Sequence, residues 1–216
     1  MLDLGFINVT DPIPIYISAF GPKGQALAGK YGDGLVFSVP PAQPALDKCL
    51  ANAERGAAQG GRMLDRATFG TTNLMAATVL EPGEDLRSDR VIEECGPVAL
   101  AGLHYSYECY LQFGVQPPPM LADIWERYVA MLEASPERSR HARIHAGHCT
   151  FVHPDEAQFV TPELLRASCL VGTPGEIFEQ IERAEGAGLK EIILLPGFSR
   201  RYRAIEDFAT KILAKL

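Results

Sequence analysis

The sequence predicts an α/β fold, in which about four strand–helix units form part of a parallel (β/α)8 TIM-type barrel with a helical insertion before the last strand. Three observations lead to this prediction. Short β-branched and apolar runs alternate with helical patterns through the first eighty residues. A helix-rich stretch, residues 82–154, then interrupts the alternation, and a helix and an apolar strand follow it. Alternating strands and helices favour a parallel sheet with right-handed crossovers.

The first unit begins with a predicted strand at residues 13–18, which Gly21 and Pro22 end. Proline is favoured at the first position of a helix, so we expect a helix from Pro22 to about Tyr31. Further boundaries come from Gly and Pro clusters. They predict a strand at residues 35–38, a helix at 44–59 and a strand at 68–80.

The insertion carries apolar residues at helical spacing in residues 91–113 and 121–134, and three prolines at 117–119 separate the two segments. Residues 142–152 are predicted to be a strand or an extended loop. After the insertion, Thr173, Pro174 and Glu176 match a capping box that starts a helix. The last predicted elements are a short helix from Thr161, a strand at 191–195 buried on both faces, and a helix at 201–216.

The composition of the chain argues against several classes of protein. The chain has a net charge of −7 and a pI near 5.3, which argues against a nucleic-acid-binding protein and an anionic membrane partner. No apolar run approaches the roughly 18 residues of a membrane span, and the start lacks the pattern of a signal peptide. The five cysteines are widely spaced without a CxxC, as in a reduced compartment. We therefore expect a cytoplasmic protein.

Two segments resemble the bacterial-luciferase-like superfamily of flavin- and F420-dependent oxidoreductases. The first runs from Pro14 to Lys23 and continues through Ala28-Gly29 to the Asp-Gly-Leu-Val at 33–36. The second comprises residues 171–174 and Gly-Ala-Gly at 186–188 before an apolar strand. The resemblance implies a single luciferase-like domain over residues 1–216 that covers strands five to eight of the barrel. Residues 82–154 would be its insertion, residues 1–11 a linker, and the first half of the barrel would be absent.

The loops after the first two predicted strands carry the candidate binding residues. Sites in such barrels lie at the C-terminal ends of the strands, often with a phosphate at a helix N-terminus. Gly21 lets the backbone approach a ligand closely, and Ser38 offers a hydroxyl group. The resemblance implies that these loops hold the cofactor phosphate; the residues alone leave an ordinary helix-opening turn as the alternative. The candidates are Ser18, Ala19, Phe20, Gly21, Ser38 and Val39.

The cofactor that the resemblance implies is FMN, with F420 as the alternative. Some F420-dependent relatives carry a lysine shortly after the position of Ser38, whereas Pro40 and Pro41 follow Val39 here. Three arginines after the last strand, at 200, 201 and 203, offer positive charge or a solvated start of the last helix.

All five histidines lie in the insertion, and His145 and His148 are the candidate catalytic residues because imidazole suits acid–base chemistry at neutral pH. The alternative interpretation is that both histidines are ordinary loop residues whose side chains are hydrogen-bonded. His141 and His153 lie nearby, but the spacing matches no standard zinc pattern and no HExxH occurs. We therefore expect no metal. His104 is predicted to line a substrate pocket with nearby tyrosines, or to pack in the core.

These features predict a luciferase-like, flavin-dependent monooxygenase or oxidoreductase, as a truncated homologue acting on a small-molecule substrate. One alternative is an F420-dependent oxidoreductase that transfers hydride. The other is a non-catalytic half-barrel that binds flavin or associates with itself. A half-barrel exposes two sheet edges and apolar strand faces, which favours a homo-oligomer or a partner half-barrel.

Overall fold

The computed structural model describes residues 11 and 13–216. Over these residues the strands form two parallel sheets, which confirms the predicted parallel α/β fold. The larger sheet has the order β1-β2-β3-β6 and comprises β1 (Tyr16–Ser18), β2 (Gly34–Phe37), β3 (Gly70–Met75) and β6 (Glu191–Leu194). The smaller sheet pairs β4 (Ala77–Val79) with β5 (Leu170–Gly172).

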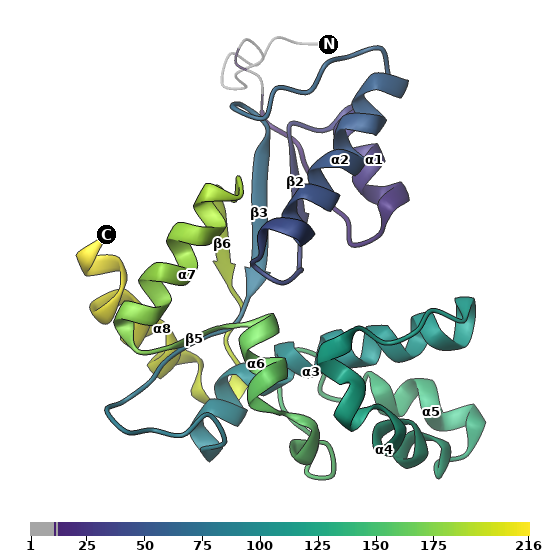
Figure 1. Ribbon diagram of the computed structural model, residues 1–216, viewed down its shortest axis with the longest axis vertical. Helices are drawn as coiled ribbons and strands as arrows, with labels where there is room; N and C mark the ends of the chain where they lie inside the picture. The colour runs from purple at the N-terminus through teal and green to yellow at the C-terminus, as the bar shows by residue number, and fades with distance from the viewer. Residues whose placement is uncertain (1–10, 12) are drawn as a thin grey trace, which may run out of the picture.

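Helices flank both sheets and fill the long excursion between β4 and β5 (Figure 1). The α-helices are α1 (Pro22–Tyr31), α2 (Gln43–Gln59), α3 (Asp89–Phe113), α4 (Ala122–Glu133), α5 (Glu137–Ile144), α6 (Pro162–Ser168), α7 (Pro174–Gly186) and α8 (Arg201–Lys211). Short 3-10 turns lie at Pro119–Leu121, Ala157–Phe159, Phe198–Arg200 and Leu213–Lys215. No helix in the described part of the chain combines the length and apolar character needed to span a bilayer.

Several predicted boundaries are wrong. Strand 68–80 divides around Ala76 into β3 and β4, which pair with different partners, and the three-residue β5 was not predicted at all. Residues 142–144 end α5 and turns follow them, so 142–152 is neither strand nor extended loop. The last α-helix ends at Lys211. Apart from Asp11, the proposed linker at 1–11 lies outside the described residues.

The two faces of the larger sheet differ. Ile17, Leu35 and Phe37 share one face, on which α1 and α2 pack to form a hydrophobic cluster. The opposite face carries Tyr16, which is 39% exposed, and Ile193, which is 46% exposed. Strand β6 is therefore not buried on both faces as predicted, because the side chains on this second face remain accessible.

Close backbone contacts shape the N-terminal unit. The ring of Tyr16 lies across Gly34 and Gly70, where an added Cβ would come within 2.8 Å and 2.2 Å of it. Helices α1 and α2 cross at Gly29 and Gly56, where an added Cβ would lie 1.8 Å from a backbone oxygen of the other helix. Glycine is required at Gly29 and Gly56 because the two helix backbones touch there, and at Gly34 and Gly70 because the Tyr16 ring fills the space of a side chain.

A buried charge cluster joins the start of α3 to the smaller sheet and α8. The guanidinium group of Arg90 donates to both carboxylate oxygens of Glu84, to Glu94 Oε2 at 3.2 Å and to the Val79 carbonyl at 3.0 Å. Asp207 of α8 lies 3.7 Å from the same group. The Glu94 side chain is fully buried, so Arg90 neutralises a charge that water cannot reach.

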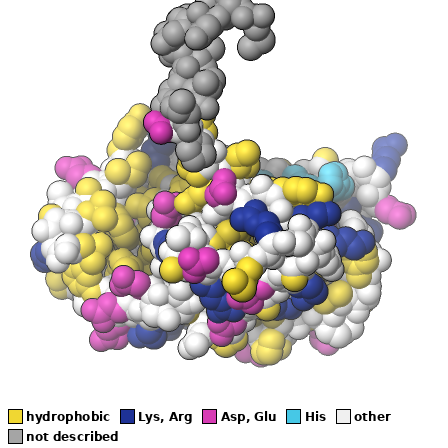
Figure 2. Space-filling view, turned by 90° about the horizontal axis from the view of Figure 1, so that it is seen from above, with side chains coloured by type: hydrophobic (Ala, Val, Ile, Leu, Met, Phe, Trp, Pro, Cys, Tyr) yellow, Lys and Arg dark blue, Asp and Glu magenta, His cyan; other side chains and the backbone are white. Residues whose placement is uncertain are grey.

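An apolar groove opens between α2, α7 and the C-terminal segment, and Figure 2 shows hydrophobic side chains gathered on this side of the molecule. Leu50, Leu189 and Leu213 are among its lining residues. The groove follows β6 from residues 188–191, at its N-terminal end, to Ile192 and Leu194, which lie on the face that α7 and α8 cover. Because sites of parallel barrels open at the C-terminal ends of the strands and not on the helix-covered face, we do not place the functional site in it.

Candidate functional site

The loops that follow β1 and β2 lie side by side at the C-terminal ends of these strands (Figure 1). The amide of Ala19 donates to the Val36 carbonyl at 2.9 Å, which extends the β1–β2 pairing into the first loop. Ala19 is buried, whereas Ser18, Phe20 and Ser38 are exposed. The structure thus brings the six predicted binding residues to one end of the sheet.

The first loop leads into a helix start with spare hydrogen-bond donors. Within the described chain no side chain caps α1, and Pro22 at its first position has no N–H. The next amides, of Lys23 and Gly24, belong to the turn whose donors have no partner inside the helix. No described atom lies within 4 Å of a Cβ built on Gly21. This end of α1 therefore has donors, a positive dipole end and open space for an anion.

The second loop is already hydrogen-bonded to β3. The Ser38 hydroxyl donates to the Leu74 carbonyl at 3.1 Å. The Val39 amide donates to Asn73 Oδ1 at 3.2 Å, and Asn73 Nδ2 returns a bond to the Val39 carbonyl at 3.0 Å. The amide of Val39 is thus occupied, and Ser38 offers only its oxygen lone pairs. Of the two loops, the first is better suited to bind a phosphate.

A buried polar chain that the sequence reasoning missed supports the first loop. Gln25 Nε2 donates to the Phe20 carbonyl at 3.3 Å, and Asn52 Nδ2 donates to Gln25 Oε1 at 2.6 Å. Arg55 donates in turn to Asn52 Oδ1. Gln25 and Asn52 are 3% and 7% exposed, so these bonds are shielded from water. One signal was present in the sequence: polar residues on the inner faces of two helices.

The candidate catalytic histidines lie in the turns after α5. His145 Nε2 is 2.9 Å from Glu108 Oε1 on α3, and His141 Nδ1 is 3.4 Å from the same oxygen. The ring of His148 lies 5.6 Å from that of His145, centroid to centroid. Desolvation lowers the pKa of His148, and the neighbouring His104 and His145 lower it further. His148 is therefore held in its neutral form more firmly than an ordinary histidine.

A second pair, formed by a histidine and a glutamate, is buried. His104 Nε2 lies 3.1 Å from Glu156 Oε1, and both side chains are 4% exposed. The ring of His104 stacks on Tyr128 at a centroid distance of 6.3 Å. Sequence reasoning placed His104 in a pocket wall or the core; the core reading is correct, and Glu156 was missed because it lies 52 residues away.

The turn region, by which we mean residues 145–157 after α5, also contacts the loop after β6. The amide of Phe198 donates to the Thr150 carbonyl at 2.8 Å. A cavity of about 320 Å³ opens beside this contact. Its lining residues come from α3, the turn region and the loop after β6, namely Asp89, Ile92, Glu93, Phe151, Val152, Ala157 and Ser199. Figure 1 shows the insertion beyond the C-terminal ends of the strands, on the same side of the sheet as the first loop.

The arginines after β6 are engaged within the chain. Arg200 pairs with Glu93, and Arg203 pairs with Glu81 and Asp207. Arg201 stacks on Phe198 and Tyr202, with its guanidinium carbon 4.2 Å and 4.5 Å from the two ring centroids. Two of the three charges are thus compensated by carboxylates, which favours the reading of a solvated helix start.

Comparison with known families gives one match over most of the chain. A family model described as luciferase-like monooxygenase matches residues 5–191. No curated protein sequence matches the chain.

Solved structures show the same fold. An F420-dependent tetrahydromethanopterin reductase from Methanopyrus kandleri has a TM-score of 0.59 at 16% identity, covering 94% of this chain and 51% of the reductase. An F420-dependent secondary alcohol dehydrogenase in complex with an F420–acetone adduct has a TM-score of 0.50 at 21% identity, covering 97% and 51%. The chain therefore spans about half the length of these structures, and its fold is a partial barrel.

Proposed function

Because the chain belongs to the luciferase-like monooxygenase family, we propose that it binds FMN, with the cofactor phosphate at the loop after β1 and the start of α1. The observation that carries this proposal is the uncapped N-terminus of α1 beside Gly21, which offers donors and open space. The exposed Lys23 adds positive charge in the same turn. The function that follows is a flavin-dependent oxidation of a small organic substrate.

The bound flavin would supply the redox chemistry, whereas the protein binds, orients and shields it. In this proposal the amides of Lys23 and Gly24 bind the phosphate, and the buried Gln25–Asn52 chain fixes the Phe20 carbonyl and so the shape of the loop. Residues 82–154 form an insertion within a single luciferase-like domain. The cavity between this insertion and the loop after β6 is the candidate substrate pocket.

F420 is the alternative cofactor. What favours FMN is the segment after Ser38, where Val39, Pro40 and Pro41 provide no lysine for a more anionic cofactor.

His145 and His148 are candidate acid–base residues. The lowered pKa of His148 keeps its ring unprotonated near neutral pH, which is the form in which an imidazole can act as a base.

The test is a fluorescence titration of the purified chain with FMN, with F420 and with riboflavin, which lacks the phosphate. We expect FMN to bind more tightly than riboflavin. Gly21→Asp should weaken FMN binding by about 10- to 100-fold, because it places a negative charge where the phosphate binds. Asp is a good N-cap residue and the φ of Gly21 is −104°, so the helix should be retained.

Gly175→Asp is the control, because Gly175, in the first turn of α7, likewise has no described atom within 4 Å of an added Cβ. This variant should bind FMN as the unaltered chain does. Equal binding of riboflavin and FMN would overturn the phosphate site. Tighter binding of F420 than of FMN would make F420 the proposed cofactor. If none of the three ligands binds, the cofactor proposal fails and the second candidate function, described next, remains.

The second candidate is a half-barrel that associates with itself. It is supported by the accessible face of the larger sheet, where Tyr16 and Ile193 are exposed on the two edge strands β1 and β6. Edge strands with apolar side chains favour pairing with another chain. A second copy would cover this face.

Light scattering after size exclusion, at low and high protein concentration, tests this association. We expect a dimer or larger assembly whose mass falls on dilution, and we expect Ile193→Lys to shift it toward the monomer. Ile205→Lys on α8 is the control, since Ile205 is 48% exposed against 46% for Ile193. A monomer at every concentration would exclude this second candidate.

A further inference from the structure

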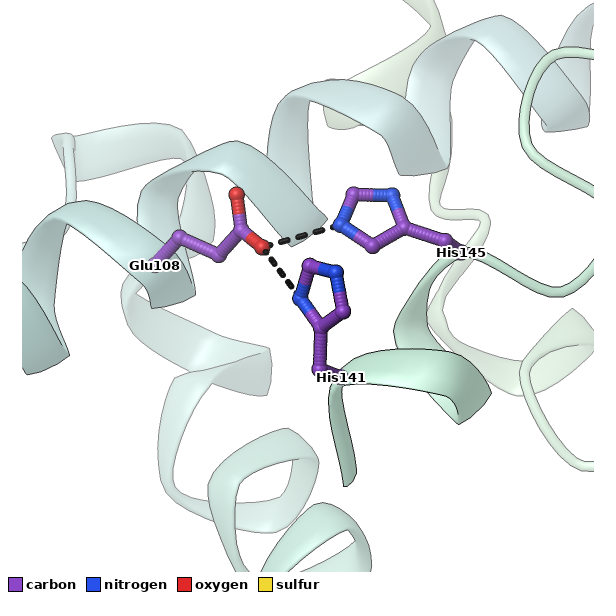
Figure 3. A group of neighbouring side chains, drawn as sticks. All are labelled: Glu108, His141 and His145. Atoms are coloured by element: carbon purple, nitrogen blue, oxygen red, sulfur yellow. Dashed lines mark hydrogen bonds and ion pairs between the residues drawn. The ribbon is translucent and has the colours of Figure 1, made fainter. Parts of the chain in front are cut away.

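Three side chains that are able to ligate a metal ion, one from α3 and two from the end of α5, converge at one point of the insertion (Figure 3). Glu108 extends from α3, His141 lies in α5, and His145 follows the last residue of α5. One ligand atom from each of the three lies within 4.8 Å of the other two. Figure 3 shows both imidazole rings directed at the Glu108 carboxylate.

The local fold creates this convergence. Residues four apart lie on one face of a helix, so the end of α5 presents His141 and His145 together, with ring centroids 4.5 Å apart. His141 uses Nδ1 and His145 uses Nε2 toward the same oxygen, Glu108 Oε1. Because Glu108 lies in the 25-residue helix α3, the carboxylate comes from a rigid element.

We propose that Glu108, His141 and His145 bind a divalent transition-metal ion of the zinc type. Two histidines and one carboxylate are a ligand set that zinc takes in proteins, with bonds of about 2.0–2.2 Å. Ligands at such bond lengths lie roughly 3.3 Å apart around a tetrahedral ion. The two oxygen–nitrogen distances here, 2.9 Å and 3.4 Å, bracket that separation.

The ion would have three protein ligands and a fourth position open to water. His141 is 80% exposed and His145 is 38% exposed, so the ion reaches the site from solvent. Bound there, it would link α5 to α3 and hold the turn region in place. The site could not be predicted from the sequence, because Glu108 lies 33 residues before His141, outside the spacing of standard zinc patterns.

Zinc binding to the full chain, freed of any affinity tag and treated with a chelator, tests the proposal by calorimetry. We expect one equivalent of Zn²⁺ and a higher melting temperature in its presence. His145→Ala and Glu108→Gln should each weaken binding by more than the roughly 10- to 100-fold that loss of an outer-shell partner costs. Co²⁺ should show the visible absorption of a tetrahedral site in the unaltered chain and lose it in both variants.

His153→Ala is the matched control, because His153 is 44% exposed and pairs with Asp155 away from the three ligands. It should bind zinc as the unaltered chain does. Substoichiometric binding by the unaltered chain, or an equal loss in the control variant, would overturn the proposal. His141→Ala separates metal binding from folding, because His141 is exposed and its removal should leave the fold intact. A folded His141→Ala variant that keeps full affinity for zinc would also overturn the proposal. A metal-bound His145 could not also act as an acid–base residue, so His148 alone would keep that proposed role. None of the binding outcomes depends on the flavin site.

Discussion

Gly29→Ala is expected to lower the free energy of unfolding by about 3 kcal/mol or more. The added methyl group would lie 1.8 Å from the Ala53 carbonyl oxygen and 2.4 Å from its carbon. These are backbone atoms in the middle of α2, so no side chain rotation relieves the overlap. The two helices would have to move apart, which would loosen the cluster that includes Ala28 and Ala53.

Urea unfolding followed by circular dichroism measures this loss. Gly102→Ala is the control, since Gly102 lies inside α3 with no described atom within 4 Å of an added Cβ. It should stabilise the protein by about 0.5–1 kcal/mol through helix propensity alone. If both substitutions change the stability by the same amount, the α1–α2 contact is not as close as described.

Arg90→Met should lower the free energy of unfolding by about 3–5 kcal/mol, because it leaves Glu94 buried without its cation. Methionine keeps the volume of the side chain while it removes the charge. In the unaltered chain Arg90 also lowers the pKa of Glu84 to about 2. In the variant the Glu84 carboxylate therefore loses its cation as well. Burial raises the pKa of Glu94. Without Arg90 the loss should therefore be smaller at pH 5, where Glu94 takes up a proton more readily, than at pH 8.

Arg87→Met provides the comparison, since Arg87 is exposed in the same segment and should change stability by less than about 0.5 kcal/mol. Adding Glu94→Gln to Arg90→Met should recover part of the loss, since the buried charge is then gone. An Arg90→Met variant as stable as the unaltered chain at pH 8 would show that Arg90 does not stabilise the fold.

The strand–helix alternation of the N-terminal unit and the capping box of α7 could be read from the sequence because their signals are local. Helix α1 begins and ends at the predicted residues, and Thr173 and Glu176 make the reciprocal bonds of a capping box. The family resemblance and the luciferase-like match agree, and the partial barrel was predicted correctly.

What escaped prediction depends on contacts that are distant in sequence. Strand β5 has three residues and is recognised only by its pairing with β4. Glu108 and Glu156 meet their histidines across 37 and 52 residues, so no spacing rule identifies them. The predicted binding residues do lie together at one end of the sheet, but the hydrogen bonds that occupy Ser38 and Val39 come from β3, which only the folded chain reveals.

The pairing of β3 with β6 also has a consequence for synthesis. Thr72 and its strand partner Glu191 are 119 residues apart, and the entire insertion lies between them. At translation rates of about 5–20 residues per second, roughly 6–24 s separate their emergence from the ribosome. During that interval the nascent chain has β1, β2 and β3 with an unpaired outer edge. The growing polypeptide therefore presents that edge to chaperones and to neighbouring nascent chains until β6 arrives.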